Sequence, residues 1–243
     1  MNRRFTIATI ISVYLVFASG GVLAQDVPVD KATVKVPEKH YSPYVGRNIP
    51  DRVLWGDTHL HTSLSPDAGL TGTTLGPEAA FRFARGEVVT STGGLKAQLR
   101  RPHDFLVVSD HAEYLGIALM LRDADPALLA DPTGKRWYDG FRKGGRDALA
   151  AAIEVVGDIG RSDQRFKSPA AMRTSWDIVI DAAERYNEPG KFTAFIGYEW
   201  TSMPNSANLH RVVIFRDGGD RARQVLPFSG GRDPDHANVV FPS

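Results

Sequence analysis

The feature that most constrains the fold is a short run of purely apolar residues near the middle of the chain. Residues 104–109 have the sequence Asp-Phe-Leu-Val-Val-Ser, in which apolar and polar positions do not alternate. A strand with this pattern is buried on both faces, as in a parallel sheet covered by helices. The run therefore indicates a strand inside the core of an α/β domain.

Other segments along the chain have strand or helix patterns. Apolar, aromatic and β-branched runs predict further strands over 52–61, 191–198 and 211–215. Start signals predict helices over 77–85 and 168–186, and an alanine-rich stretch predicts a helix over 139–156. Strands that alternate with helices imply a parallel sheet with crossover helices. The expected class is α/β, with the sheet either open or closed into a barrel. Pairs of glycines are expected in turns, since none has the spacing of a phosphate-binding loop: Gly93-Gly94, Gly144-Gly145 and Gly218-Gly219.

Composition removes several functional classes. The formal net charge of the 243 residues is +1, which gives no case for a nucleic-acid or anionic-membrane partner. The chain has no cysteine, so disulfides, thiolate-bound zinc and a cysteine nucleophile are excluded. Any metal ion must be held by imidazole and carboxylate groups, which suit zinc, manganese or iron.

The first 24 residues have the pattern of an export signal. A short basic start is followed by an apolar run over 5–17 and by Val22-Leu23-Ala24, a small-residue cleavage pattern. The alternative is an uncleaved membrane anchor, since 5–24 is just long enough to span a bilayer. With cleavage, the protein is periplasmic or secreted and has no stable membrane insertion. Residues 25–50 are an extended lead-in, and the domain is expected over 51–243.

Two histidines, His59 and His61, lie two positions apart on the first predicted strand. Side chains at this spacing point to one face, and both lie at the carboxyl end, where α/β folds place their sites. Together they can bind one metal ion. Asp57 is a candidate to accept a hydrogen bond from an imidazole nitrogen that does not bind the ion. The alternative is a surface or capping role. Asp67 follows in a loop that can curl back, either as a ligand or as a turn residue.

The next two strands end in further candidate ligands. Asp110-His111 follows the apolar run directly, and a charged pair there is costly to bury unless it is paired or metal-bound. The alternative is a strand end in solvent. Glu113 is either a supporting acceptor or a first-turn helix residue. Glu199 ends the third strand and could bridge two ions, or it could pair with a nearby cation.

The remaining candidates are less well placed. His210 precedes its apolar run, so it reaches the same edge only through a hairpin return from Glu199 or from a loop before the strand. Arg211 could bind an anionic substrate group or form a surface pair. His103 precedes a strand and is expected at the opposite edge, and His40 and His236 have no supporting residues nearby. Ser65 and Ser109 lack a nucleophile-elbow pattern.

At these positions the chain resembles the polymerase-and-histidinol-phosphatase (PHP) superfamily of metalloenzymes. The resemblance rests on an ordered set of motifs, and it is closest to an exported bacterial branch known as a domain of unknown function. It covers roughly 53–229. The motifs are Trp55-Gly-Asp-Thr-His-Leu-His-Thr-Ser-Leu-Ser-Pro-Asp67, Asp104-Phe-Leu-Val-Val-Ser-Asp-His-Ala-Glu-Tyr-Leu-Gly116, Phe195-Ile-Gly-Tyr-Glu-Trp-Thr-Ser202 and His210.

The resemblance implies a distorted (βα)7 barrel that holds two or three ions of zinc, manganese or iron. His59 and His61 would share one ion with Glu199, and Glu199 with His210 would hold a second. Asp67 and His111 would hold a third. Glu199, His111 and Asp67 are the implied catalytic residues, and a metal-bound hydroxide would attack a phosphorus or carbonyl centre.

One part of the superfamily pattern is not found. Its members complete the site with a further histidine and a late Asp-x-His, whereas Asp235-His236-Ala-Asn does not have that spacing. The resemblance therefore leads us to expect a fragment or truncated product, the N-terminal part of the barrel, with open strand edges that favour aggregation.

Three functions are carried forward from the sequence. The first is an exported phosphoesterase acting on a small-molecule substrate. The second is an amidohydrolase, a class that also places His-x-His at its first strand but usually needs a bridging lysine. The third is a non-catalytic metal-binding fragment.

Overall fold

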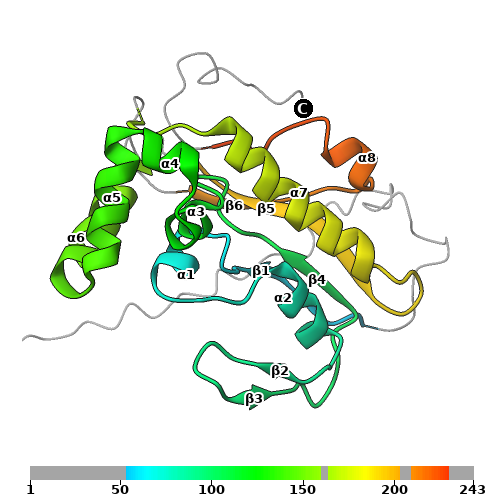
Figure 1. The fold of residues 1–243 in the computed structure, drawn as a ribbon. Coiled ribbons are helices and arrows are strands. Elements are labelled where there is room, and N and C mark those ends of the chain that lie inside the picture. The colour runs from blue at the N-terminus through cyan, green and yellow to red at the C-terminus, as the bar shows by residue number, and fades with distance from the viewer. Residues whose placement is uncertain (1–52, 160–163, 203–208, 230–243) are drawn as a thin grey trace, which may run out of the picture. The chain divides into compact units, whose positions relative to one another are not determined.

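The computed structural model describes residues 53–159, 164–202 and 209–229. They form a mixed α/β fold around a curled sheet that resembles half of a barrel (Figure 1). Four strands pair in the order β1-β4-β5-β6, and β2 and β3 form a separate hairpin. The strands are β1 (Gly56–Leu60), β2 (Val89–Thr90), β3 (Lys96–Ala97), β4 (Phe105–Val108), β5 (Thr193–Ser202) and β6 (Leu209–Ile214).

The apolar run forms β4, the central strand that the sequence predicts. Leu106, Val107 and Val108 are fully buried, and β4 pairs in parallel with β1 on one side and with β5 on the other. Parallel neighbours place their carboxyl ends at the same edge of the sheet. The pairing continues beyond β4 as an isolated bridge between His111 and Glu199. Two predicted ligands are therefore neighbours across the backbone.

The fourth strand departs from the parallel pattern. β6 pairs with β5 antiparallel, with Glu199 opposite Val212 and Thr201 opposite His210. This hairpin return is the arrangement that His210 needs to reach the edge occupied by Glu199. The α/β class is confirmed in its mixed form. A closed (βα)7 barrel is not formed by the described strands.

Helices cover one face of the sheet and extend beyond one end of it. α2 and α7 pack against β4 and β5, while α5 and α6 lie side by side away from the sheet (Figure 1). The helices are α1 (Pro66–Leu70), α2 (Pro77–Ala84), α3 (Ile117–Asp123), α4 (Pro126–Ala130), α5 (Pro132–Lys143), α6 (Gly145–Ile159), α7 (Pro169–Tyr186) and α8 (Gly219–Ala222). As predicted, α7 starts at a serine cap, where the Ser168 hydroxyl accepts a hydrogen bond from the backbone of Ala171.

The helix predicted over 139–156 is two helices. α5 ends at Lys143 and α6 begins at Gly145. Gly144 and Gly145 both have positive φ, 73° and 55°, which residues in the interior of a right-handed helix do not adopt. The expectation of a turn at this glycine pair is confirmed, and the continuous helix is wrong because the alanine-rich pattern on its own did not place the break.

The main core lies between the sheet and α7. Alternate residues of β5, including Ile196 and Tyr198, face α7, where Trp176 is fully buried. The indole of Trp176 packs edge-on against Tyr198 and donates a hydrogen bond of 3.1 Å to the carbonyl of Ala222. The odd-numbered residues of β5 point to the other face of the sheet. Glu199 and Thr201 therefore lie on the face opposite this core.

A second core joins the α5–α6 pair to the loop after β4, and a buried carboxylate lies within it. Asp158 is fully buried and accepts hydrogen bonds from the Tyr114 hydroxyl at 2.5 Å and from the backbone and guanidinium of Arg165 at 2.9 and 2.6 Å. Burial alone would raise the pKa of Asp158, but these donors outweigh burial and lower the pKa.

Replacing Asp158 with alanine should therefore lower the free energy of unfolding at pH 7 by about 1–3 kcal/mol, because buried donors lose their acceptor. A lowered folded-state pKa contributes stability above the ordinary value of 3.8 that is lost as pH falls through the folded value. The difference in the free energy of unfolding between variant and wild type should therefore become smaller as the pH of the urea titration is lowered from 7 to about 3. Asp123→Ala, at an exposed pair with Arg122, is the control. A constant difference across this range would contradict the assignment.

Some predictions fall outside the described residues. The export signal, the lead-in, His40 and His236 lie there, as does the end of the chain where truncation is expected. Among the helices of 53–159, 164–202 and 209–229, none combines the length and the apolar character needed to cross a bilayer.

Candidate metal centre

The carboxyl edge of the sheet brings six predicted ligands together. β1 supplies His59 and leads directly into His61, the segment after β4 supplies His111, and the β5–β6 hairpin supplies Glu199 and His210. Asp67 comes from α1. Their donor atoms form three groups, in each of which all donors lie within 4.8 Å of one another: His59, His61 and Glu199; His61, Asp67 and His111; and His111, Glu199 and His210.

Glu199 is the centre of this cluster. Its side chain is ionisable but only 1% exposed. Nitrogen atoms of three histidines lie within 3.0 Å of its carboxylate oxygens. One oxygen, Oε2, lies 3.0 Å from His59 Nε2 and 2.7 Å from His61 Nε2. The other oxygen, Oε1, lies 2.7 Å from His210 Nδ1. The two oxygens therefore face different histidines, as the bridging interpretation of the sequence requires.

His61 has a second contact through its other nitrogen. Nδ1 lies 2.7 Å from Asp67 Oδ2, and the hydroxyl of Ser65 is 3.4 Å away. Ser65 is fully buried, donates to Asp67 at 2.5 Å and accepts a hydrogen bond of 3.1 Å from the backbone of His111. The sequence pattern argues only against Ser65 as a nucleophile and does not predict its contacts with three candidate ligands. Its position two residues before Asp67 is the signal that could have indicated it.

His111 is held in a similar way. Its Nε2 lies 3.4 Å from Glu199 Oε2, while Nδ1 lies 3.3 Å from Glu113 Oε2 and 3.2 Å from the Thr201 hydroxyl. Glu113 is 1% exposed, and its other oxygen accepts a hydrogen bond from the backbone of Thr201. Of the two roles left open for Glu113, the geometry fits the supporting acceptor. Thr201, which the sequence did not single out, also lies 3.2 Å from His210 Nδ1.

Asp110 has a structural role next to the cluster. Its carboxylate accepts hydrogen bonds from both the backbone and the hydroxyl of Thr62. Burial raises the pKa of Asp110 to about 6, against the lowering effect of these bonds. Asp110, for which the sequence predicts a partner if it is buried, is thus paired with Thr62 in the loop after His61. Its neighbour His111 points toward the cluster.

The cluster shifts the pKa of its own members. Burial would lower the pKa of His61 and His111, but hydrogen bonds to Asp67 and Glu113 and the charge of Glu199 raise both. Burial would raise the pKa of Glu199 and Asp67, but the adjacent imidazoles lower both. The carboxylates are therefore ionised at neutral pH, the state in which they bind cations.

The donors fit a divalent metal ion. His61 Nε2 and Glu199 Oε1 are buried and have no hydrogen-bond partner among the described residues. Even so, His61 Nε2 lies 2.7 Å from Glu199 Oε2, and Glu199 Oε1 lies 2.7 Å from His210 Nδ1. Close approach without hydrogen-bond geometry is what ligands of one ion show, because each points its lone pair at the ion. Imidazole and carboxylate suit zinc, manganese or iron. The structure thus contains a buried histidine–glutamate cluster that could bind metal, as predicted.

Two supporting residues are not where the sequence placed them. Asp57 accepts a hydrogen bond of 2.8 Å from the backbone of His59 and does not reach an imidazole nitrogen. Arg211 follows His210 and so points to the opposite face of β6, where its guanidinium lies 5.3 Å from the centre of the Trp200 ring. The substrate contact from Arg211 stays a prediction, and the contact seen here is with Trp200. His103 lies just before β4, at the opposite edge, as expected.

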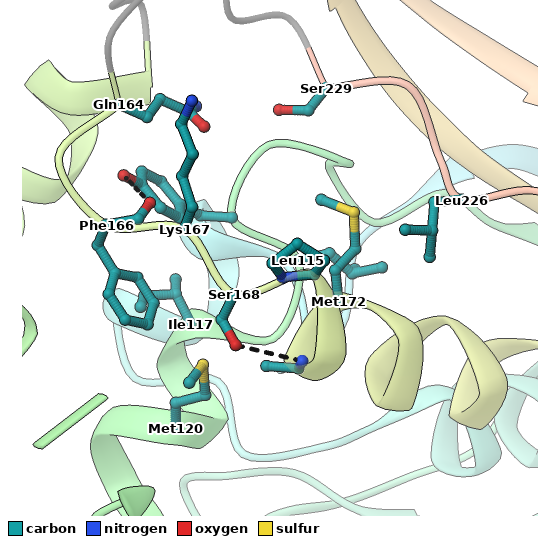
Figure 2. A pocket seen from close by; sticks show the side chains of 13 residues that line it. Leu115, Ile117, Met120, Gln164, Phe166, Lys167, Ser168, Met172, Leu226 and Ser229 are labelled. Carbon is teal, nitrogen blue, oxygen red and sulfur yellow. Dashed lines mark hydrogen bonds between the residues drawn. The ribbon is translucent and has the colours of Figure 1, made fainter. Parts of the chain in front are cut away.

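An apolar pocket of about 320 Å³ lies near the start of α7 and is separate from the cluster. Figure 2 shows Met120, Phe166 and Met172 around it, with Gln164 and Lys167 at its rim. None of the six candidate ligands lines it. The chemistry that the donor set offers therefore belongs to the sheet edge and not to this pocket.

Comparisons with known proteins identify the family alone. No curated protein and no solved structure matches the chain. The family described as "Protein of unknown function (DUF3604)" matches residues 48–239. That span contains all six candidate ligands and every described helix and strand. The chain belongs to the DUF3604 family.

Proposed function

We propose that this protein is an exported metal-dependent hydrolase of the PHP superfamily, acting on small-molecule phosphoesters. The observation that carries the proposal is Glu199, a carboxylate that is 1% exposed and whose two oxygens each contact histidine nitrogens within 3.0 Å. A structural ion pair needs one partner for such a group, whereas a carboxylate that bridges two cations needs ligands on both sides. The proposed barrel and substrate class rest on the motif resemblance, and the proposed export rests on the signal pattern of the first 24 residues.

The residues divide into two sides around Glu199. His59 and His61 would hold an ion against Oε2. His210, which faces Oε1, would hold a second ion together with His111, whose Nε2 lies 3.4 Å from Oε2 and which shares a ligand group with His210 and Glu199. Divalent ions bound here would supply Lewis-acid activation of water and stabilisation of developing negative charge. Amidohydrolases usually bridge their ions with a lysine, whereas in this proposal the Glu199 carboxylate takes the bridging position.

The exposure of the ligands indicates how substrate would reach the site. The side chains of His59 and His210 are 51% and 42% exposed, whereas Glu199 is 1% exposed. Glu199 therefore lies at the bottom of the cluster, and the two outer histidines lie at its open side. Substrate would approach between His59 and His210, while the buried carboxylate is kept from bulk water.

Metal loading with hydrolysis assays tests the proposal. The purified protein, loaded with Zn²⁺ or Mn²⁺, should hydrolyse bis-p-nitrophenyl phosphate or p-nitrophenyl phosphate faster than p-nitroanilide amides or lactones. Chelation with EDTA should abolish the activity, and returning the metal should restore it. His59→Ala should lose activity and bound metal, because it removes a ligand whose own side chain is 51% exposed.

His103→Ala is the matched control, since His103 lies at the opposite edge of the sheet and should keep both metal and activity. Metal binding without any hydrolysis would support a non-catalytic metal-binding protein instead. Hydrolysis of amides or lactones but not of phosphoesters would favour amidohydrolase chemistry. Activity that survives in EDTA would overturn the metal-dependent assignment.

A further inference from the structure

The three ligand groups share residues, and this sharing limits how many ions they can hold together. His61 and His111 each belong to two groups, as does Glu199. A carboxylate has two oxygens and can serve two ions at once. A neutral imidazole has one nitrogen with a free lone pair, and its other nitrogen carries hydrogen. Each histidine can therefore serve only one of its two groups.

For His61, the contacts decide which nitrogen faces the ion. Nε2 lies 2.7 Å from Glu199 Oε2, is buried and lacks a hydrogen-bond partner within the described part of the chain. Nδ1 lies 2.7 Å from Asp67, which is itself tied to Ser65 and to the backbone of Ala68. Nδ1–H donating to Asp67 leaves Nε2 for the ion. Asp67 is then an acceptor that orients His61.

For His111, the distances give the same result. Nε2 lies 3.4 Å from Glu199 Oε2 but 3.9 Å from Asp67 Oδ2. Nδ1 lies 3.3 Å from the buried carboxylate of Glu113 and 3.2 Å from the Thr201 hydroxyl, and the backbone of Thr201 donates to the other oxygen of Glu113. Each central histidine thus has Glu199 at Nε2 and a second carboxylate at Nδ1, the arrangement that commonly orients metal-bound histidines.

Resting on the proposed function, we infer that this cluster holds two ions, one on each side of Glu199, and that Asp67 and Glu113 are positioning residues for His61 and His111. The group of His61, Asp67 and His111 then holds no third ion, because both of its histidines are committed to the other two groups. This assigns Asp67 a role different from the ligand role that the resemblance implies.

Conservative and truncating variants separate a ligand from a positioning residue. Asp67→Asn and Glu113→Gln keep an oxygen that can accept from Nδ1–H, so both should bind two Zn²⁺ with nearly wild-type affinity. Asp67→Ala and Glu113→Ala remove the acceptor and should bind two Zn²⁺ about 10–100-fold more weakly. Bound zinc is counted by elemental analysis after gel filtration, and affinity is measured by calorimetric titration of the apoprotein.

Asp123→Ala, at an exposed surface pair, controls for general loss of charge and should behave as wild type. His59→Ala and His210→Ala should each lose one ion. Three zinc ions in the wild type, or loss of an ion in Asp67→Asn, would overturn the inference while leaving the metal centre in place. Failure of the wild type to bind zinc would instead overturn the proposed function. If an alanine variant does not fold, the count in Asp67→Asn and Glu113→Gln still decides.

Discussion

Replacing Glu199 with glutamine should remove both metal ions, the largest functional effect that the structure predicts. Glutamine keeps the shape of the side chain but has one carbonyl oxygen and no charge, so it cannot serve ligand groups on both sides. The four histidines would then bind metal ions without the negative charge of the carboxylate that contacts all four of them. We expect Zn²⁺ affinity to fall by roughly 100-fold or more, beyond the usual effect of losing an outer acceptor.

The measurement is calorimetric titration of apo Glu199→Gln with Zn²⁺, together with a count of retained zinc. Glu188→Gln is the control, because Glu188 lies in the turn before β5 and pairs with Arg85 and Lys191 at the far edge of the sheet. The control should bind zinc as the wild type does. Two zinc ions retained by Glu199→Gln would show that the carboxylate does not bridge, and the site would have to be reassigned.

Replacing Trp176 with alanine should give the largest loss of stability. The indole is fully buried between the sheet and α7, contacts Tyr198 and Phe215, and has its N–H bonded to Ala222. Truncation removes this packing and leaves a cavity that close neighbours fill only in part. We expect the free energy of unfolding to fall by about 3–5 kcal/mol, as measured by urea denaturation of the apoprotein.

Trp55→Ala is the matched control, since the same truncation is made at a residue that is 58% exposed. It should change the free energy of unfolding by about 0.5 kcal/mol or less. Similar losses at both positions would mean that the core described here does not form around α7.

The sequence predicts the site better than the whole fold, because local rules govern the site. A spacing of two residues places His59 and His61 on one face of a strand whatever else the chain does. Likewise, the apolar run of β4 requires partners on both sides, and these bring the segments that carry His111 and Glu199 next to each other. The two-residue period of a strand and the apolar character of β4 were enough to predict that these histidines and Glu199 lie close together.

Other features depend on contacts that no local pattern encodes. The direction of β6 follows from its pairing with β5, and this direction puts His210 in the site and Arg211 on the opposite face. Glu113 becomes a partner of His111 because the left-handed backbone at Tyr114 and the buried Asp158 hold the loop after β4 in place. Asp67 reaches His61 through a short helix that the sequence did not predict.

Anomalous X-ray diffraction from crystals of the zinc-loaded protein tests the central claim most directly. The account predicts two zinc peaks, one on each side of the Glu199 carboxylate, with His59 and His61 next to one peak and His111 and His210 next to the other. The absence of any peak at the Glu199 carboxylate in zinc-loaded crystals would contradict it.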